Sequence, residues 1–392
     1  MQTRRSTRRE AGASRYNPSA VLYEQRRSAI RPAAFVMPAA FPEFVAPFRT
    51  FLDGIPPNGR VVVFCHFDAD GLAAGALFGR GLQRLQPGWQ VEVLPSGKGE
   101  NAFLTPAVRE KLLALKPDAL LVTDLGVHAH GTLEADGVPV LYVDHHIPEG
   151  YPPAGSTVLT GYGLDPVPCS AWLAYELVAA ETDLTDLRWV AAIGIISDLG
   201  DAAPWPPLAE TKKQHTAKWL KEAVAMCNAA RRAGEFDLAL PLRYLMADDN
   251  PRGLAQDATL ATYRAEVSAA LNAARKLPPR FPPKSPDASP VALITIDSPC
   301  QIHPLIAQQW IQRLPDRVVL CANLGYLADG QVAVAGRTAN RDLHIPELLR
   351  TAFARTGATP PTNFAHGHPQ ASGGHLSTAD FALLLRGLGY ES

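Results

Sequence analysis

The sequence has few cysteines and no long apolar run. Five cysteines occur among 392 residues and no two form a CxxC pair, which fits a reducing cytosol and argues against a disulfide framework or a thiolate zinc site. No run of about 18 apolar residues is present, so we expect no membrane span. The N-terminal segment also lacks the apolar stretch of a secretory signal, so we expect a cytoplasmic protein.

The chain has little net charge, but its charge is unevenly distributed. The total is −1, whereas residues 1–32 hold eight arginines against Glu10 and Glu24, which makes that segment +6 and the remainder −7. Such a basic arm suggests a polyanionic partner, because arginines neutralise phosphates and release counterions. A solvated tail is the alternative interpretation. A mitochondrial-type presequence is a third, and the two acidic residues argue against it.

Strand and helix patterns alternate from about residue 40 onward. Short apolar runs predict strands at 61–65, 91–94, 119–123 and 138–143, with helical patterns such as 72–85 between them. This alternation predicts an α/β fold with a doubly wound parallel sheet.

A helical segment at 256–276 and a proline-rich stretch at 277–290 divide this region from a second α/β pattern. Six prolines in fourteen residues exclude a helix or a central strand, so the stretch is a linker. We therefore predict four parts, which are a basic arm over 1–35, a catalytic domain over 36–253, a connecting helix and linker over 254–290, and a smaller α/β domain over 291–392.

Acidic and histidine residues follow three of the predicted strands. They are His66, Asp68 and Asp70 after the first, Asp124 after the third, and Asp144, His145 and His146 after the fourth. The carboxyl ends of parallel strands meet at one edge, where ligands bind. Carboxylates gathered there repel one another, and a cation relieves the repulsion. Mixed carboxylate and imidazole ligands suit manganese better than calcium.

Each motif alone has an ordinary structural explanation. Asp68-x-Asp70-Gly71 is often a turn, and Asp124 could cap a helix. Three such motifs after three strands favour a metal site instead. Asp198, after an apolar helical stretch, is a fourth candidate ligand, and Asp201 could take its place.

The order of these motifs resembles the DHH phosphoesterase superfamily, over roughly residues 40–250. The C-terminal part adds to the resemblance, because 367–374 is similar to the glycine-rich motif of the DHH-associated domain and 334–338 to its arginine-bearing strand. The resemblance implies a RecJ-like or nanoRNase-like nuclease.

The resemblance also implies roles for single residues around two Mn²⁺ ions, for which Mg²⁺ or Co²⁺ could substitute. Asp124 would bridge the ions, and the other ligands would be Asp70, His145 and Asp198 for one and His66 and Asp68 for the other. His146 would hold the scissile phosphate and Asp144 would orient a ligand imidazole. The substrate would bind Arg337, Gly367, His368, Gly373 and Gly374.

Two positions depart from the family pattern. His66 stands two residues before Asp68, where nanoRNase-like members space this histidine by four. His366 replaces a glycine of the C-terminal motif, and we expect the nearby His375 to be a surface residue.

We therefore predict a metal-dependent exonuclease acting on single-stranded DNA or RNA, with roles such as DNA repair or RNA degradation. Trp205 beside Lys212, Lys213 and Lys218 is compatible with a strand-binding channel, although Trp205 could equally be core. The alternatives are a phosphodiesterase of short oligonucleotides, cyclic dinucleotides or phosphoadenosine phosphate, and an inactive nucleic-acid-binding protein. A monomer and a homodimer both remain open.

Overall fold

The computed structural model describes residues 41–98, 100, 105–283, 290–361 and 364–390. The predicted basic arm therefore lies outside the described residues. Within the described ranges, no helix is both long and apolar enough to cross a membrane.

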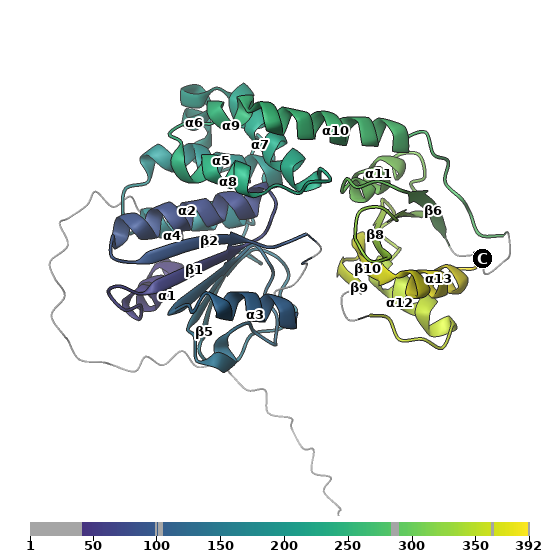
Figure 1. The fold of residues 1–392 in the computed structure, drawn as a ribbon, viewed down its shortest axis with the longest axis horizontal. Helices are drawn as coiled ribbons and strands as arrows, with labels where there is room; N and C mark the ends of the chain where they lie inside the picture. Colours follow the sequence, from purple (N-terminus) through teal and green to yellow (C-terminus); the bar gives the residue numbers. More distant parts are fainter. Residues whose placement is uncertain (1–40, 99, 101–104, 284–289, 362–363, 391–392) are drawn as a thin grey trace, which may run out of the picture. The chain divides into compact units, whose positions relative to one another are not determined.

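The first sheet has five strands in the order β2-β1-β3-β4-β5, and every neighbouring pair is parallel (Figure 1). The strands are β1 (Arg60–Cys65), β2 (Gln90–Pro95), β3 (Ala119–Thr123), β4 (Val140–Asp144) and β5 (Ser156–Thr160). The inner strands are buried on both faces, which explains their continuous apolar sequences. The predicted parallel sheet is confirmed, and β5 is an additional strand.

Helices cover both faces of this sheet (Figure 1). Val61 and Val63 point into a core shared with α2 (Ala69–Leu85), α4 (Ser170–Ala179) and α5 (Arg188–Leu199). Val62 and Phe64 point to the opposite face and pack with Val108 of α3 (Pro106–Ala114). Successive strand residues face opposite sides, so one apolar run supplies both cores.

Further helices surround this core. They are α1 (Pro42–Asp53), α6 (Leu208–His215), α7 (Ala217–Arg232), α8 (Ala239–Ala247), α9 (Arg252–Gln256) and α10 (Ala258–Ala274), the last matching the predicted helix at 256–276. Trp205 is only 2% exposed, and its Nε1 donates to Glu176 Oε1 at 3.1 Å. Trp205 is thus a core residue, and its suggested place in a strand-binding channel is wrong.

The second sheet is mixed, with the order β6-β7-β8-β10-β9. Its strands are β6 (Val291–Ile296), β7 (Val318–Asn323), β8 (Gln331–Thr338), β9 (Phe364–His368) and β10 (Ala371–Ser377). Only β6 and β7 pair in parallel. Its helices are α11 (His303–Trp310), α12 (Ile345–Arg355) and α13 (Thr378–Gly387). The α/β class predicted for this region is confirmed.

The pairing of the strands explains why residue 373 is a glycine. A Cβ atom at Gly373 would lie 2.1 Å from the carbonyl oxygen of Val334 on β8, so only glycine fits without moving a strand. The β10 backbone thus needs this glycine for sheet pairing, whatever the residue does for a substrate.

Candidate metal centre

The carboxyl edge of the parallel sheet gathers every predicted metal ligand. Their donor atoms form three groups, each lying within 4.8 Å: His66, Asp68 and Asp124; Asp70, His145 and Asp198; and Asp124, His145 and His146. The loops after β1, β3 and β4 supply most of them, because these neighbouring parallel strands all end at this edge. Two of the groups share Asp124 and two share His145.

Asp124 lies between two imidazoles. Its Oδ1 is 3.3 Å from Nε2 of His145, and its Oδ2 is 3.5 Å from Nδ1 of His66. The residue is buried and has a φ of 65°, a left-handed conformation that costs free energy for any residue with a side chain. Because its two oxygens face different imidazoles, one carboxylate can serve two cations.

The spacing of the donor atoms fits small divalent cations. Nδ1 of His66 is buried and forms no hydrogen bond with a described residue, although it lies 3.2 Å from Asp68 Oδ2 and 3.5 Å from Asp124 Oδ2. Donor atoms held by one cation through bonds of about 2.1 Å lie roughly 3.0–3.4 Å apart. A shared cation therefore accounts for the arrangement of His66 better than a hydrogen bond does.

The carboxylates create a strongly negative field at this edge. Burial lowers the pKa of His66, but Asp68 and Asp124 raise it to about 10. Burial likewise lowers the pKa of His145, but Asp124, with Asp70 and Asp198, raises it to about 10. The carboxylates around both imidazoles thus favour positive charge there, which a bound cation could supply in place of the protons. Although burial raises the pKa of Asp124, the imidazoles hold it well below its usual value.

Helix α4 positions two of the carboxylates. The amides of Ser170 and Ala171 donate to Asp70 at 2.8 and 3.0 Å, while the Ser170 hydroxyl donates to Asp124 Oδ1 at 2.8 Å. Burial and Asp124 raise the pKa of Asp70 well above its usual value. On α5, a Cβ at Gly194 would lie 2.7 Å from Asp70 Oδ1, so this glycine leaves room for the carboxylate.

Ser170 was not among the predicted site residues. It lies 46 residues from Asp124 and 100 from Asp70 along the chain. Its local sequence therefore carries no motif that ties it to either carboxylate.

Asp144 holds His146 rather than His145. Its Oδ1 accepts from the backbone N of His146 at 2.7 Å and lies 3.1 Å from the Nδ1 of that residue, while its Oδ2 accepts from Gly126 N at 2.8 Å. Asp144 therefore orients the imidazole of His146, the proposed phosphate-binding residue, rather than that of a proposed metal ligand.

Asp198 rather than Asp201 joins the donor groups. Asp198 Oδ2 lies 3.8 Å from His145 Nδ1, whereas Asp201 forms an ion pair with Lys221. The first of the two alternatives left open by the sequence therefore has the better geometry.

Two arginines at the end of α7 lie near the acidic edge. Arg231 donates to Asn228 Oδ1 and Gln301 Oε1, both at 2.9 Å, and its guanidinium lies 5.7 Å from the ring centre of Phe67. Burial and Arg231 lower the pKa of Arg232 to about 9, while Asp68 raises it. The sequence interpretation missed both arginines, because adjacent basic residues at a helix end are usually solvated.

The predicted substrate residues lie in the mixed sheet, outside the metal-donor groups. Arg337 on β8 and His368 on β9 both pair with Ala371 of β10, so their side chains leave the same face of the sheet. Gly367 and Gly374 have φ values of 105° and 146°, which only glycine adopts readily. The guanidinium of Arg337 donates to its neighbour's carbonyl at 2.8 Å and forms no ion pair with any described carboxylate.

A buried polar pair lies close to Arg337. Nδ1 of His303 and the hydroxyl of Tyr326 are both buried, and neither has a hydrogen-bond partner among the described residues. Burial, with smaller contributions from His375 and Arg337, lowers the pKa of His303 to about 3. No motif in the sequence pointed to this pair.

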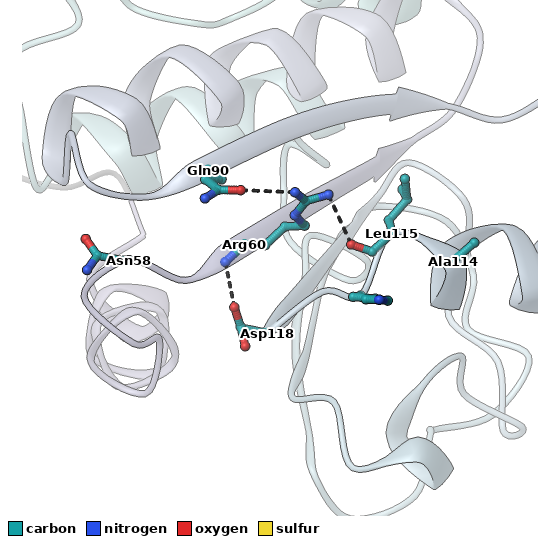
Figure 2. A pocket seen from close by; sticks show the side chains of 7 residues that line it. Asn58, Arg60, Gln90, Ala114, Leu115 and Asp118 are labelled. Atoms are coloured by element: carbon teal, nitrogen blue, oxygen red, sulfur yellow. Dashed lines mark hydrogen bonds between the residues drawn. The ribbon is translucent and has the colours of Figure 1, made fainter.

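A hollow at the opposite edge of the parallel sheet carries no comparable chemistry. Figure 2 shows the Arg60 guanidinium donating to Gln90 Oε1 and to the Leu115 carbonyl, and the Arg60 amide donating to Asp118. These polar groups satisfy one another, so the hollow offers few free partners to a ligand.

The chain is similar to several known proteins. Residues 60–195 match the family model described as DHH family, N-terminal domain. The single-stranded-DNA-specific exonuclease RecJ of Thermus thermophilus is 30% identical over 225 residues, covering 48% of this chain and 33% of that protein. The solved structure of RecJ from this organism with Mn²⁺ has a TM-score of 0.65 and 20% identity, covering 91% of this chain and 55% of that one. An exonuclease RecJ bound to manganese has a TM-score of 0.63 and 20% identity, covering 91% and 95%.

The fold and the donor groups define a protein with a divalent-metal site at the carboxyl edge of a parallel α/β sheet. Residues 60–195 are thus similar to the N-terminal domain of the DHH family, and the fold is similar to that of RecJ, as the motifs predicted. It spans about a third of the length of the curated RecJ protein and 55% of the solved Thermus thermophilus chain.

Proposed function

We propose that this chain is an exonuclease that hydrolyses phosphodiester bonds of single-stranded nucleic acid with two divalent cations. The observation that carries the proposal is the placement of Asp124, whose two oxygens face His66 and His145 separately. A carboxylate in this position can bridge two ions, and two-metal sites serve in-line phosphoryl displacement.

The ligands divide into two sets around Asp124. Asp70, His145 and Asp198 would hold one cation, and His66 and Asp68 the other, in agreement with the donor groups. When bound, two such cations activate water and stabilise negative charge on phosphate oxygens. Manganese suits the mixed ligands, and magnesium or cobalt are the expected substitutes.

The protein's own residues would bind and orient the substrate. His146, held by Asp144, is exposed enough to contact the scissile phosphate. Arg231 and Arg232 place positive charge near Asp68, where the sugar–phosphate backbone would approach. Arg337 and His368 would bind a second phosphate or nucleotide, because a planar guanidinium pairs well with phosphate oxygens.

We propose that the predicted division into parts also describes the function. Residues 36–253 would form the catalytic domain, 254–290 the connection and 291–392 the substrate-binding domain, and the separate apolar cores of the two sheets support this division. The predicted cytoplasmic location fits the five cysteines, all of which are free and buried.

A panel of metals and substrates tests the proposal. The purified chain would be incubated with Mn²⁺, Mg²⁺ or Co²⁺ and with 5′-labelled 20-mers, dinucleotides and cyclic dinucleotides. We expect Mn²⁺-dependent shortening of the 20-mers. Cleavage of dinucleotides or cyclic dinucleotides but not of 20-mers would replace the exonuclease with a small-nucleotide phosphodiesterase, and no cleavage of any substrate would overturn the proposal.

A further inference from the structure

Exposed apolar side chains concentrate in the loops that follow β4 and β5. Seven large apolar side chains are exposed among the described residues, and four of them fall between residues 147 and 167. We call these four the apolar rim: Ile147, Tyr151, Tyr162 and Val167. Ile147 directly follows His146, and the others lie in the loops after β4 and β5.

Strand register brings the start of the loop that carries Tyr162 beside the start of the segment that carries His146. Asp144 on β4 pairs with Thr160 on β5, and the pairing continues because Gly161 N donates to the Asp144 carbonyl at 2.8 Å. Tyr162 and His146 each stand two residues beyond this pair. Since neighbouring strands lie about 4.8 Å apart, the loop that carries Tyr162 leaves the sheet one strand away from the segment that carries His146, the proposed phosphate-binding residue.

The loop carrying Tyr162 is braced. A Cβ at Gly161 would lie 2.8 Å from Cγ of Pro168, so the two ends of the loop pack tightly. Leu164 N donates to the Gly161 carbonyl at 3.1 Å, and Tyr162 N donates to Thr160 Oγ1 at 3.1 Å. An exposed ring on a fixed backbone loses little conformational entropy when a flat ligand stacks on it.

The loop carrying Tyr151 is braced as well. Glu149 N donates to the Val127 carbonyl at 2.9 Å, which ties this loop to the one after β3. Gly150 packs so closely against Ala129 that a Cβ would lie 2.7 Å from the Ala129 methyl group. Both tyrosines therefore stand on loops that the sheet edge holds in place.

We infer that Tyr162, supported by the rest of the apolar rim, stacks on a nucleobase next to the scissile phosphate. The inference rests on the proposed function and extends it by naming the surface that holds a base. Continuity with the metal centre points to a base as the occupant, because a phosphate held at His146 would place its attached nucleoside near the neighbouring loop that carries Tyr162. Stacking tolerates every base, so the contact selects unpaired strands rather than a sequence.

Binding of a fluorescent strand tests the inference without catalysis. Wild-type protein would be titrated, in Ca²⁺ in place of Mn²⁺, into single strands carrying 2-aminopurine at each of the first four positions from either end. We expect quenching at one position only. Tyr162→Ala should abolish that quenching and Tyr162→Phe should keep it. Phe281→Ala is the matched control, because Phe281 is 47% exposed, close to the 49% of Tyr162, but stacks on Arg317.

Abasic strands give the second readout. Replacing the base at the quenched position by a tetrahydrofuran residue should weaken wild-type binding by roughly 5- to 150-fold. Tyr162→Ala should weaken binding of the normal strand to a similar extent and leave binding of the abasic strand unchanged. Equal losses on both strands, or no loss on either, would overturn the stacking role.

These outcomes can be distinguished from a failure of the proposed function. Wild-type protein that quenches and discriminates the abasic strand, yet cleaves nothing with any metal, would keep the base-binding surface and reject the exonuclease. Dimers seen by light scattering for wild-type protein but not for Tyr162→Ala would make the rim an interface between copies and overturn the inference.

Discussion

Histidines in the two sheets have pKa values shifted in opposite directions. At the parallel sheet, carboxylates raise the pKa of His66 and His145 to about 10 despite their burial. At the mixed sheet, burial with nearby His375 and Arg337 lowers the pKa of His303 to about 3. The same residue type thus reports a negative field at the first site, whereas at the second it reports mainly burial, with a smaller contribution from the positive charge of Arg337. The first site is suited to cations, and the charge of Arg337 at the second is suited to anions such as phosphate.

The largest expected effect is at the negative site. Asp124→Asn removes the charge between the two imidazoles while keeping a residue type that tolerates a positive φ. We expect hydrolysis to fall by roughly 10³-fold or more, equivalent to about 4 kcal/mol of barrier. The measurement is Mn²⁺-dependent turnover together with the metal content of the dialysed protein. A variant that retains both metals and substantial turnover would contradict the bridging role.

The positive site should respond through substrate binding. Arg337→Ala should raise KM by roughly 10- to 100-fold with little change in kcat, because a charge-assisted pair with phosphate is lost. The KM of Arg337→Lys should lie between those of the wild type and Arg337→Ala, because lysine keeps the charge but lacks the planar guanidinium that pairs with phosphate. Arg313→Ala, which removes a charge stacked on Trp310, is the control. An unchanged KM would exclude Arg337 from the substrate site.

The lowered pKa of His303 predicts acid sensitivity of the mixed sheet. As pH falls from 7 to 5, the unfolded chain binds a proton at this histidine and the folded chain does not, so stability is lost. Over that interval the wild type should lose about 2 kcal/mol more than His303→Gln, measured by urea unfolding at both pH values. Equal losses in the two proteins would show that His303 titrates normally.

The smallest effect is expected at Ser170, whose hydroxyl orients the Asp124 carboxylate. Ser170→Ala removes the hydroxyl that donates to Asp124 Oδ1 at 2.8 Å. We expect metal affinity to fall by roughly 10-fold, the lower end for residues that orient metal ligands. Titration calorimetry with Mn²⁺ measures this, with Ser197→Ala on α5 as the control. An affinity equal to that of the wild type would make the hydroxyl dispensable.

The sequence predicted the parallel sheet well because its inner strands are buried on both faces. The runs at 61–65 and 119–123 correspond to β1 and β3 almost residue for residue. The edge strand β5 was missed, since its sequence STVLT is short, half polar and only partly buried. Edge strands need fewer apolar residues, so their sequences resemble those of loops.

The β9–β10 hairpin was missed for a different reason. Its strands contain glycines, which have low strand propensity, and they are held by the pairing of β10 with β8 and of β9 with β10 rather than by apolar alternation. The glycine-rich motif at 367–374 was recognised through its resemblance to a family. The strand pairing that determines its conformation could not be predicted from the sequence.

The candidate ligands could be found from the sequence because each follows a strand at one sheet edge. The residues that position these ligands could not be found in this way. Ser170 and Gly194 act on Asp70 and Asp124 across long stretches of chain, and Arg231 approaches Asp68 only through the packing of α7. Such contacts depend on how helices pack, which periodicity does not specify.

Asp70 joins the metal centre to the first turn of α4, since the same carboxylate that would bind a cation accepts the amides of Ser170 and Ala171. A cation that fixes Asp70 would also restrain that turn. Amide hydrogen exchange at Ser170 and Ala171 should therefore slow as the protein takes up Mn²⁺. The helix would then report metal occupancy in a protein that has neither substrate nor turnover.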